Sequence, residues 1–181
     1  MSTRDLAWLM AVSLVVAGCA GTTVVETPNL GQPLTAAQVA PWDISIPPDG
    51  AGLPAGRGTP AQGALVYEAK CQSCHGTKGA GGPNDRLVGG HGTLATTSPV
   101  RTVGSYWPYA TTLFDYVRRA MPYAQSQSLT SDEVYALTAY LLHQNGIIAG
   151  ADEMNAQTLP LVKMPNRDNF IVVYPAKPAA R

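Results

Sequence analysis

The stretch Cys71-Gln72-Ser73-Cys74-His75 places two of the three cysteines of this chain within five positions and ends on a histidine. A Cys-x-x-Cys-His run is typical of c-type haem attachment, in which two thiols add to the two vinyl groups of one haem. The histidine that follows can then fill one axial position of the iron. The spacing therefore predicts one covalent haem c, held by Cys71 and Cys74, with His75 as the first axial ligand.

Two other readings of the cysteine pair are a zinc site and a thioredoxin-like redox pair. A zinc site needs a second pair of ligands, and the chain has no second Cys-x-x-Cys run. A redox pair does not need the adjacent histidine, and it normally opens a helix, whereas this pair follows an apparent helix. Both alternatives explain less of the pattern than haem attachment does.

Length and composition point to one small domain with extensions. The chain has 181 residues, a formal net charge of zero and only 13% charged residues. A neutral chain has no basic footprint for nucleic acid, so nucleic-acid binding is excluded as a function. The 18 glycines and 15 prolines indicate that much of the chain forms loops or extended segments.

The N-terminus has the pattern of an export signal. Arg4 precedes an apolar run over residues 6–17, which is too short for a membrane-spanning helix. The sequence Val16-Ala17-Gly18-Cys19 resembles a bacterial lipobox, which implies a signal peptide at residues 1–18 and a lipid on Cys19. The alternative is a plain secretory signal cut a few residues later. We expect the protein on the periplasmic side of a bacterial membrane, lipid-anchored, or otherwise soluble in the periplasm.

The remaining chain divides into three parts. Residues 19–59 are rich in proline and lack helical periodicity, which predicts a tether and an extended arm. Residues 60–148 form the predicted haem domain, and residues 149–181 form a C-terminal tail that packs on it.

Three helices are predicted in the haem domain, over about residues 60–71, 111–120 and 131–145. Pro60 suits the first turn of the first helix, and Thr130 with Glu133 forms a capping box for the third. Gly63 lies inside the first helix, where glycine is unfavourable, and we interpret it as a point of close approach to another helix. The predicted fold class is mostly α, with three main helices around one covalent haem and extended segments at both ends.

A second axial ligand is predicted at Met121, where Met-Pro ends the second helix and the chain can turn away while the thioether points inward. The competing residues are His91, His143, Met154 and Met164. Tyr106 and Trp107 are candidates for the haem edge, although ordinary core packing explains them equally well. Arg118 and Arg119 could each pair with a propionate or an acidic group, or could face solvent.

With these residues in place, the chain resembles a class I cytochrome c. In that family the first and last helices cross, and a glycine and an aromatic residue on one meet a leucine and an aromatic residue on the other. Gly63, Tyr67, Leu137 and Tyr140 match this pattern. The axial methionine of the family precedes the last helix, as Met121 does.

A narrower resemblance covers residues 30–170 and concerns the cytochrome subunit of sulfane dehydrogenase in the Sox sulfur-oxidation pathway and related sulfite dehydrogenase cytochromes. It rests on the sequence runs at residues 48–54, 102–108, 115–122, 132–137 and 165–170. The resemblance implies a partner subunit with a molybdenum cofactor and a downstream cytochrome or oxidase. Two departures are the single haem site, where the subunit often has two haem domains, and the lipid anchor.

The function predicted from these features is the transfer of single electrons by a non-catalytic subunit. Alternatives are a free or membrane-tethered electron shuttle to a terminal oxidase, and a haem enzyme or sensor with an open iron site. The last would require that Met121 does not bind the iron.

Overall fold

The computed structural model describes residues 30–171 and 173, so the predicted signal peptide and Cys19 lie outside the described residues. The chain divides into two units, residues 1–39 and residues 40–181. In the first unit, the short helix α2 (Ala36–Val39) buries none of its residues. The Thr35 backbone N–H donates to Gln38 Oε1 at 2.9 Å, which caps this turn.

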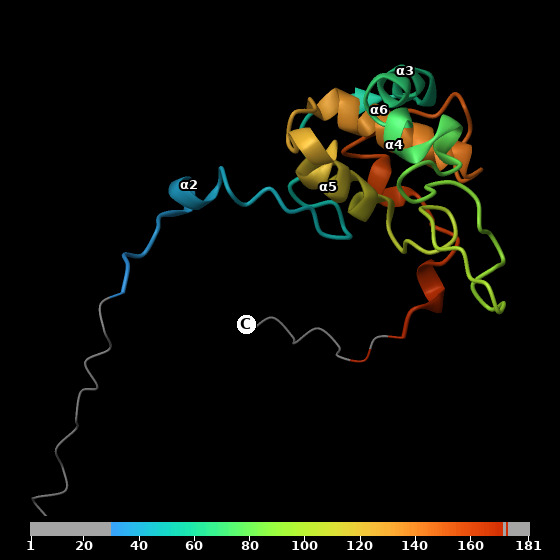
Figure 1. The fold of residues 1–181 in the computed structure, drawn as a ribbon. Helices are drawn as coiled ribbons and strands as arrows, with labels where there is room; N and C mark the ends of the chain where they lie inside the picture. Colours follow the sequence, from blue (N-terminus) through green and yellow to red (C-terminus); the bar gives the residue numbers. More distant parts are fainter. Residues whose placement is uncertain (1–29, 172, 174–181) are drawn as a thin grey trace, which may run out of the picture. The chain divides into compact units, whose positions relative to one another are not determined.

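The second unit is built on three main helices, α3 (Pro60–Lys70), α5 (Ala110–Ala120) and α6 (Ser131–Gln144), as Figure 1 shows. The four-residue helix α4 (Gln72–His75) follows α3 directly. Short 3-10 turns occupy the connections: η1 (Thr77–Gly79), η2 (Tyr123–Gln125), η3 (Leu159–Leu161) and η4 (Arg167–Asn169). The three predicted helices are confirmed with nearly the predicted bounds.

Side chains that cap the first turn define where α3 and α6 begin. Thr130 Oγ1 accepts from the Glu133 backbone N–H, while the Glu133 carboxylate accepts from the Thr130 N–H, so the predicted capping box is confirmed. Thr59 and Gln62 form the same arrangement at the start of α3, and the sequence analysis missed it. Each box satisfies two amides that have no partner within the helix.

The helices α3 and α6 cross in close contact at Gly63. A Cβ atom at this position would lie 2.5 Å from the carbonyl carbon of Ala136 and 2.7 Å from Tyr140 Cβ. Beside this crossing, the rings of Tyr67 and Tyr140 stack with centroids 5.0 Å apart. The prediction that Gly63 permits close approach of another helix is confirmed.

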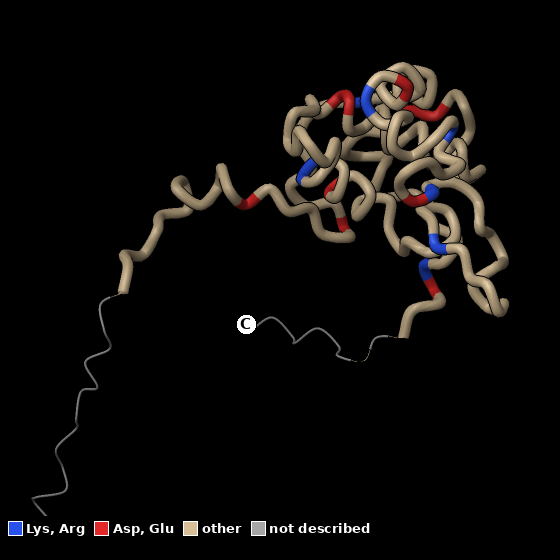
Figure 2. The backbone as a smooth tube through the Cα atoms, viewed as in Figure 1, with Lys and Arg blue, Asp and Glu red and all other residues tan. Residues whose placement is uncertain are grey.

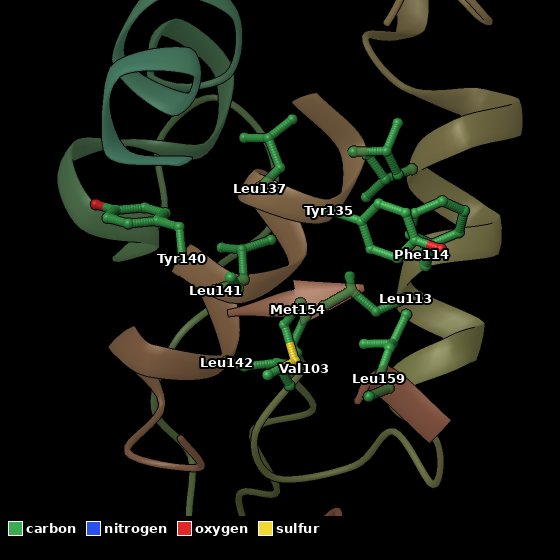
Figure 3. Packing of buried hydrophobic residues seen from close by; sticks show 14 of the residues in the cluster. Val103, Leu113, Phe114, Tyr135, Leu137, Tyr140, Leu141, Leu142, Met154 and Leu159 are labelled. Atoms are coloured by element: carbon green, nitrogen blue, oxygen red, sulfur yellow. The ribbon is translucent and has the colours of Figure 1, made fainter. Parts of the chain in front are cut away.

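The core surrounds α6, which buries every residue from Val134 to Leu142. A helix that is buried all round needs neighbours on several sides, and here α3, α5 and the segments β1 and β2 supply them. Phe114 of α5 packs on Tyr135 of α6 with ring centroids 4.5 Å apart. Figure 3 shows how Leu113 and Phe114 face the side chains of α6, with Met154 and Leu159 close by.

A two-residue ribbon joins the tail to the start of the haem domain. Strand β1 (Arg57–Gly58) pairs antiparallel with β2 (Met154–Asn155), so that Gly58 is opposite Met154. Met154, Leu159 and Met164 are buried in the same core as the helices. The part of the tail from residue 154 to residue 164 therefore packs on the domain.

The arm is held to α5 by polar side chains. The buried Asp115 carboxylate accepts from the Ile46 backbone N–H at 2.8 Å and pairs with Arg119. Arg118 Nη1 donates to the Ile44 carbonyl oxygen at 3.2 Å. Of the roles considered for the two arginines, Arg119 thus meets an acidic group, and Arg118 binds the backbone of the arm.

Candidate haem site

The attachment motif lies at the junction of α3 and α4. Cys71 ends α3, where its backbone N–H donates to the Tyr67 carbonyl oxygen at 2.9 Å. Its own carbonyl oxygen accepts from the N–H groups of Cys74 and His75, which begins the next turn. This tight turn brings the two thiols and the imidazole to the wall of one cavity.

Both thiols of the motif are free, since Cys71 and Cys74 form no disulfide. Cys71 is half-buried and Cys74 is exposed. Burial raises the pKa of the Cys71 thiol to about 11, although the neighbouring Lys70 opposes the shift. The thiol is therefore protonated at neutral pH and is a weak nucleophile in the protein alone.

The ring of His75 is oriented by a backbone carbonyl. Its Nδ1 lies 2.8 Å from the carbonyl oxygen of Asp85, so an Nδ1–H group donates to that oxygen. In this tautomer Nε2 carries a free lone pair and can ligate a metal. The loop after the motif therefore orients the imidazole as a ligand.

Two adjoining hollows open beside the motif. His75 and Met121 border both of them, together with the apolar side chains of Leu87, Val117 and Leu141. Ligand sites in proteins commonly have mainly apolar walls with a few polar groups. The lining therefore suits a large, flat, apolar group with a few polar contacts.

Met121 follows the last residue of α5. Its backbone is extended, with φ −120° and ψ 146°, and its N–H donates to the Val117 carbonyl oxygen at 3.1 Å. The helix stops here because the next residue is Pro122, and proline disfavours helical geometry at the preceding position. The side chain of Met121 is half-buried and lines the cavity.

The four competing ligands lie elsewhere. Met154 and Met164 are buried in the core, and neither borders either hollow. His143 points its Nδ1 at the Ile148 carbonyl oxygen, 3.3 Å away. His91 is exposed at a separate groove. Among the five candidates, Met121 is the one that shares the cavity with His75.

These residues fit a covalent haem c. Two free thiols stand at the spacing that thioether attachment requires, and an imidazole with a free nitrogen and a thioether border the same space. Within the described residues, no group of three His, Cys, Asp or Glu side chains could hold a metal ion without a haem.

The two aromatic residues proposed for the haem edge, Trp107 and Tyr106, lie in different surroundings. Trp107 borders the second hollow and packs edge-on against Tyr116, with ring centroids 5.7 Å apart. Tyr106 borders neither hollow. Its ring contacts Phe170 of the tail, with centroids 5.5 Å apart, and the guanidinium of Arg101 lies 5.6 Å from its centre.

Asn145, at the end of α6, is a supporting residue that was not singled out from the sequence. Its Oδ1 accepts from the Gly89 N–H at 3.0 Å, and its Nδ2 donates to the Leu87 carbonyl oxygen at 3.2 Å. These bonds tie the end of α6 to the loop that follows the motif. A Cβ on Gly104 would lie 2.6 Å from Asn145 Cγ, so Gly104 leaves room for this bridge.

Two comparisons with known proteins found similar chains. A family model described as cytochrome c oxidase, cbb3-type, subunit III matches residues 58–141. A chain in the crystal structure of the sulfane dehydrogenase SoxCD from Paracoccus pantotrophus is 38% identical, with a TM-score of 0.75. That match covers 82% of this chain and 72% of the other. No curated protein matches the chain.

The fold and the cavity define a c-type cytochrome, a class whose members are typically electron carriers with covalently bound haem c and are typically periplasmic in bacteria. The chain belongs to this family, and it is related to the cytochrome c electron carrier of sulfane dehydrogenase. The predicted fold class is confirmed. Between residue 30 and residue 173, the described helices include none with the length and apolar character needed to cross a membrane.

Proposed function

We propose that this chain is a monohaem c-type cytochrome that accepts single electrons as a subunit of a periplasmic molybdenum sulfite or sulfane dehydrogenase. The observation that carries the proposal is the cavity that His75 and Met121 share beside the free thiols of Cys71 and Cys74. The relationship to a sulfane dehydrogenase chain supplies the class of partner.

In this proposal, Cys71 and Cys74 would hold the haem as thioethers, while His75 and Met121 would supply ligands to its iron. Bound haem supplies a one-electron ferric–ferrous couple. A methionine ligand raises the reduction potential relative to a second histidine, which suits acceptance of electrons. Leu87, Val117 and Leu141 make the walls apolar and keep water from the ligands. The Asp85 carbonyl holds the His75 imidazole in the ligating tautomer.

The lipid anchor is part of the same proposal. The lipobox-like sequence before Cys19 would attach the chain to a membrane, and the proline-rich segment that follows would tether the haem domain. We expect the Cys19→Ser variant to move from the membrane fraction to the soluble fraction. A wild-type chain that is already soluble, with a mature N-terminus beyond Cys19, would refute the anchor.

A second candidate function is a membrane-tethered shuttle that delivers electrons to a terminal oxidase. The match to the family described as subunit III of a cbb3-type oxidase favours it. The two functions differ in the partner: a dehydrogenase subunit co-purifies in the first case, and the cytochrome is isolated without one in the second.

The optical spectrum of the holoprotein tests the axial pair. We expect a low-spin haem with the weak red absorption band of a methionine–iron bond in the ferric state. The Met121→Ala variant should lose this band and bind carbon monoxide when reduced, whereas the control Met164→Leu should keep the band because Met164 is packed in the core. A wild-type haem that is high-spin and binds carbon monoxide readily would refute the assignment.

A further inference from the structure

The arm is a built element of the haem domain over residues 44–48. Beyond the bonds to Asp115 and Arg118, Thr111 Oγ1 donates to the Pro48 carbonyl oxygen at 3.1 Å. Ile46 is 6% exposed and belongs to the hydrophobic core. Polar side chains of α5 and the burial of Ile46 therefore fix this segment in place.

Trp42, directly before the fixed segment, is 85% exposed. In an extended chain it would point to the same side as Ile44 and Ile46. A tight turn prevents this, because the Ile44 N–H donates to the Trp42 carbonyl oxygen at 3.1 Å. The turn therefore leaves the indole ring of Trp42 in solvent, two residues before Ile44, whose backbone is bound by Arg118.

The surroundings of Trp42 resemble the centre of a protein interface. Trp42 borders a hollow that is open to solvent, together with Pro41, Ile44, Arg119 and Gln127. Trp and Arg are the residues most enriched where a few contacts dominate binding. Since the backbone beside Trp42 is already fixed, little conformational entropy would be lost when a partner covers the ring.

Charge distinguishes a protein partner from a membrane. No Lys or Arg occurs between Arg4 and Arg57, whereas Glu26, Asp43 and Asp49 lie in that stretch. Segments that bind anionic bilayers through charge carry basic residues, and this stretch carries none, which favours a protein as the partner of Trp42. Asp43 is exposed, and among the described residues it forms no ion pair. Figure 2 shows Lys and Arg in blue and Asp and Glu in red, scattered along the described backbone.

The comparison shows that the arm or the tail is shared with a chain from a dehydrogenase crystal. The match to the SoxCD chain covers 82% of the present sequence, which is far more than residues 60–148 alone supply. The shared region must therefore include residues from the arm, from the tail or from both.

We propose that Trp42, with Pro41, Ile44 and Arg119, is the docking anchor for the molybdenum-containing catalytic subunit, and inserts into an apolar pocket with basic residues at its rim opposite Asp43. This inference rests on the proposed function, because it assigns the surface through which that complex forms. The hollow beside Trp42 shares no lining residue with the haem cavity.

The test measures binding of the holocytochrome to the molybdenum-containing subunit of a sulfane dehydrogenase from the same organism. We expect Trp42→Ser to raise the dissociation constant by at least about 30-fold, the effect of losing a dominant interface residue. Asp43→Lys should weaken binding as well, by placing like charges together. The control Leu65→Ser removes another exposed apolar side chain, 71% exposed on α3, and should bind as the wild type does.

Haem reduction separates this inference from the function on which it rests. If substrate reduces the haem through the catalytic subunit and Trp42→Ser binds as tightly as wild type, the docking anchor is wrong and the function stands. If a photo-cross-linker at position 42 in living cells captures a different redox protein, the proposed function is wrong. Capture of lipid, of a second copy or of nothing would overturn the anchor. Capture of the catalytic subunit, lost in Asp43→Lys, would support it.

Discussion

Replacement of Gly63 by alanine tests the helix crossing that frames the haem cavity. The new Cβ would lie 2.5 Å from the Ala136 carbonyl carbon and 2.7 Å from Tyr140 Cβ, with the Ala136 oxygen still closer. These atoms belong to the backbone and the first side-chain carbon of a buried helix, so no rotamer change can relieve the overlap. The two helices would have to move apart, and α3 carries Cys71 at its end.

The size of the effect follows from two opposing contributions. Alanine in place of glycine favours a helix by about 1 kcal/mol. Overpacking of a core costs about 1–3 kcal/mol, and the cost lies at the upper end when backbone must shift. We expect a net loss of about 2 kcal/mol, which corresponds to a melting temperature lower by about 4–8 °C.

Thermal and urea denaturation of the holoprotein would measure this change. The matched control is Ala69→Gly, at an exposed position of the same helix, which reports the propensity difference without any crossing. We expect it to lose about 1 kcal/mol. If Gly63→Ala instead stabilises the protein by the amount that the control loses, the close approach is not a constraint and the reasoning fails.

Two further predictions concern polar contacts at the helix surfaces. Asp115→Ala leaves the buried Ile46 N–H without its acceptor, so we expect the free energy of unfolding to fall by about 1–3 kcal/mol. Amide hydrogen exchange in the arm should become faster. The control Asp49→Ala, at an exposed position, should leave exchange at Ile46 unchanged. The hydrogen bond from Lys70 holds the pKa of Glu133 below its ordinary value, so this carboxylate stabilises the fold at neutral pH, and the contribution is lost as acid protonates it. Glu133→Gln should therefore cost about 0.5 kcal/mol at neutral pH and nothing once acid has protonated Glu133, measured by urea denaturation; an equal difference in neutral and acidic solution would contradict the ion pair.

Local patterns were sufficient to predict the helices and the attachment site. Thr130 and Glu133 define a helix start within four residues, and Met121-Pro122 defines a helix end within two, because both effects act between neighbours in the chain. Gly63 could be interpreted as a crossing point because glycine inside a helix lowers the stability of that helix, and a close tertiary contact can offset the loss. The Thr59 box was missed although it obeys the same local rule.

Contacts between distant segments were not predictable in this way. Arg118 and Arg119 lie just before Met121, so a contact with a haem propionate and a contact elsewhere were equally compatible with the sequence. In the structure Arg118 binds the Ile44 carbonyl of the arm, and Arg119 pairs with Asp115. Trp42 shares the apolar character of Ile46, yet one is exposed and the other buried, because a turn between them reverses the side.

The amino-acid sequence by itself predicted the covalent chemistry of this protein, since Cys71, Cys74 and His75 fall within five consecutive positions whose spacing is set by the chain. The tertiary structure decided which side chains from distant segments lie at one cavity. It brings the predicted Met121 there and packs Met164 in the core, and it places Trp107 but not Tyr106 at the wall. It also sets the carbonyl of Asp85 behind the imidazole, which the sequence did not indicate. The physical reason is that long-range packing depends on how whole helices and loops exclude water from a common core, which the spacing of neighbouring residues does not specify.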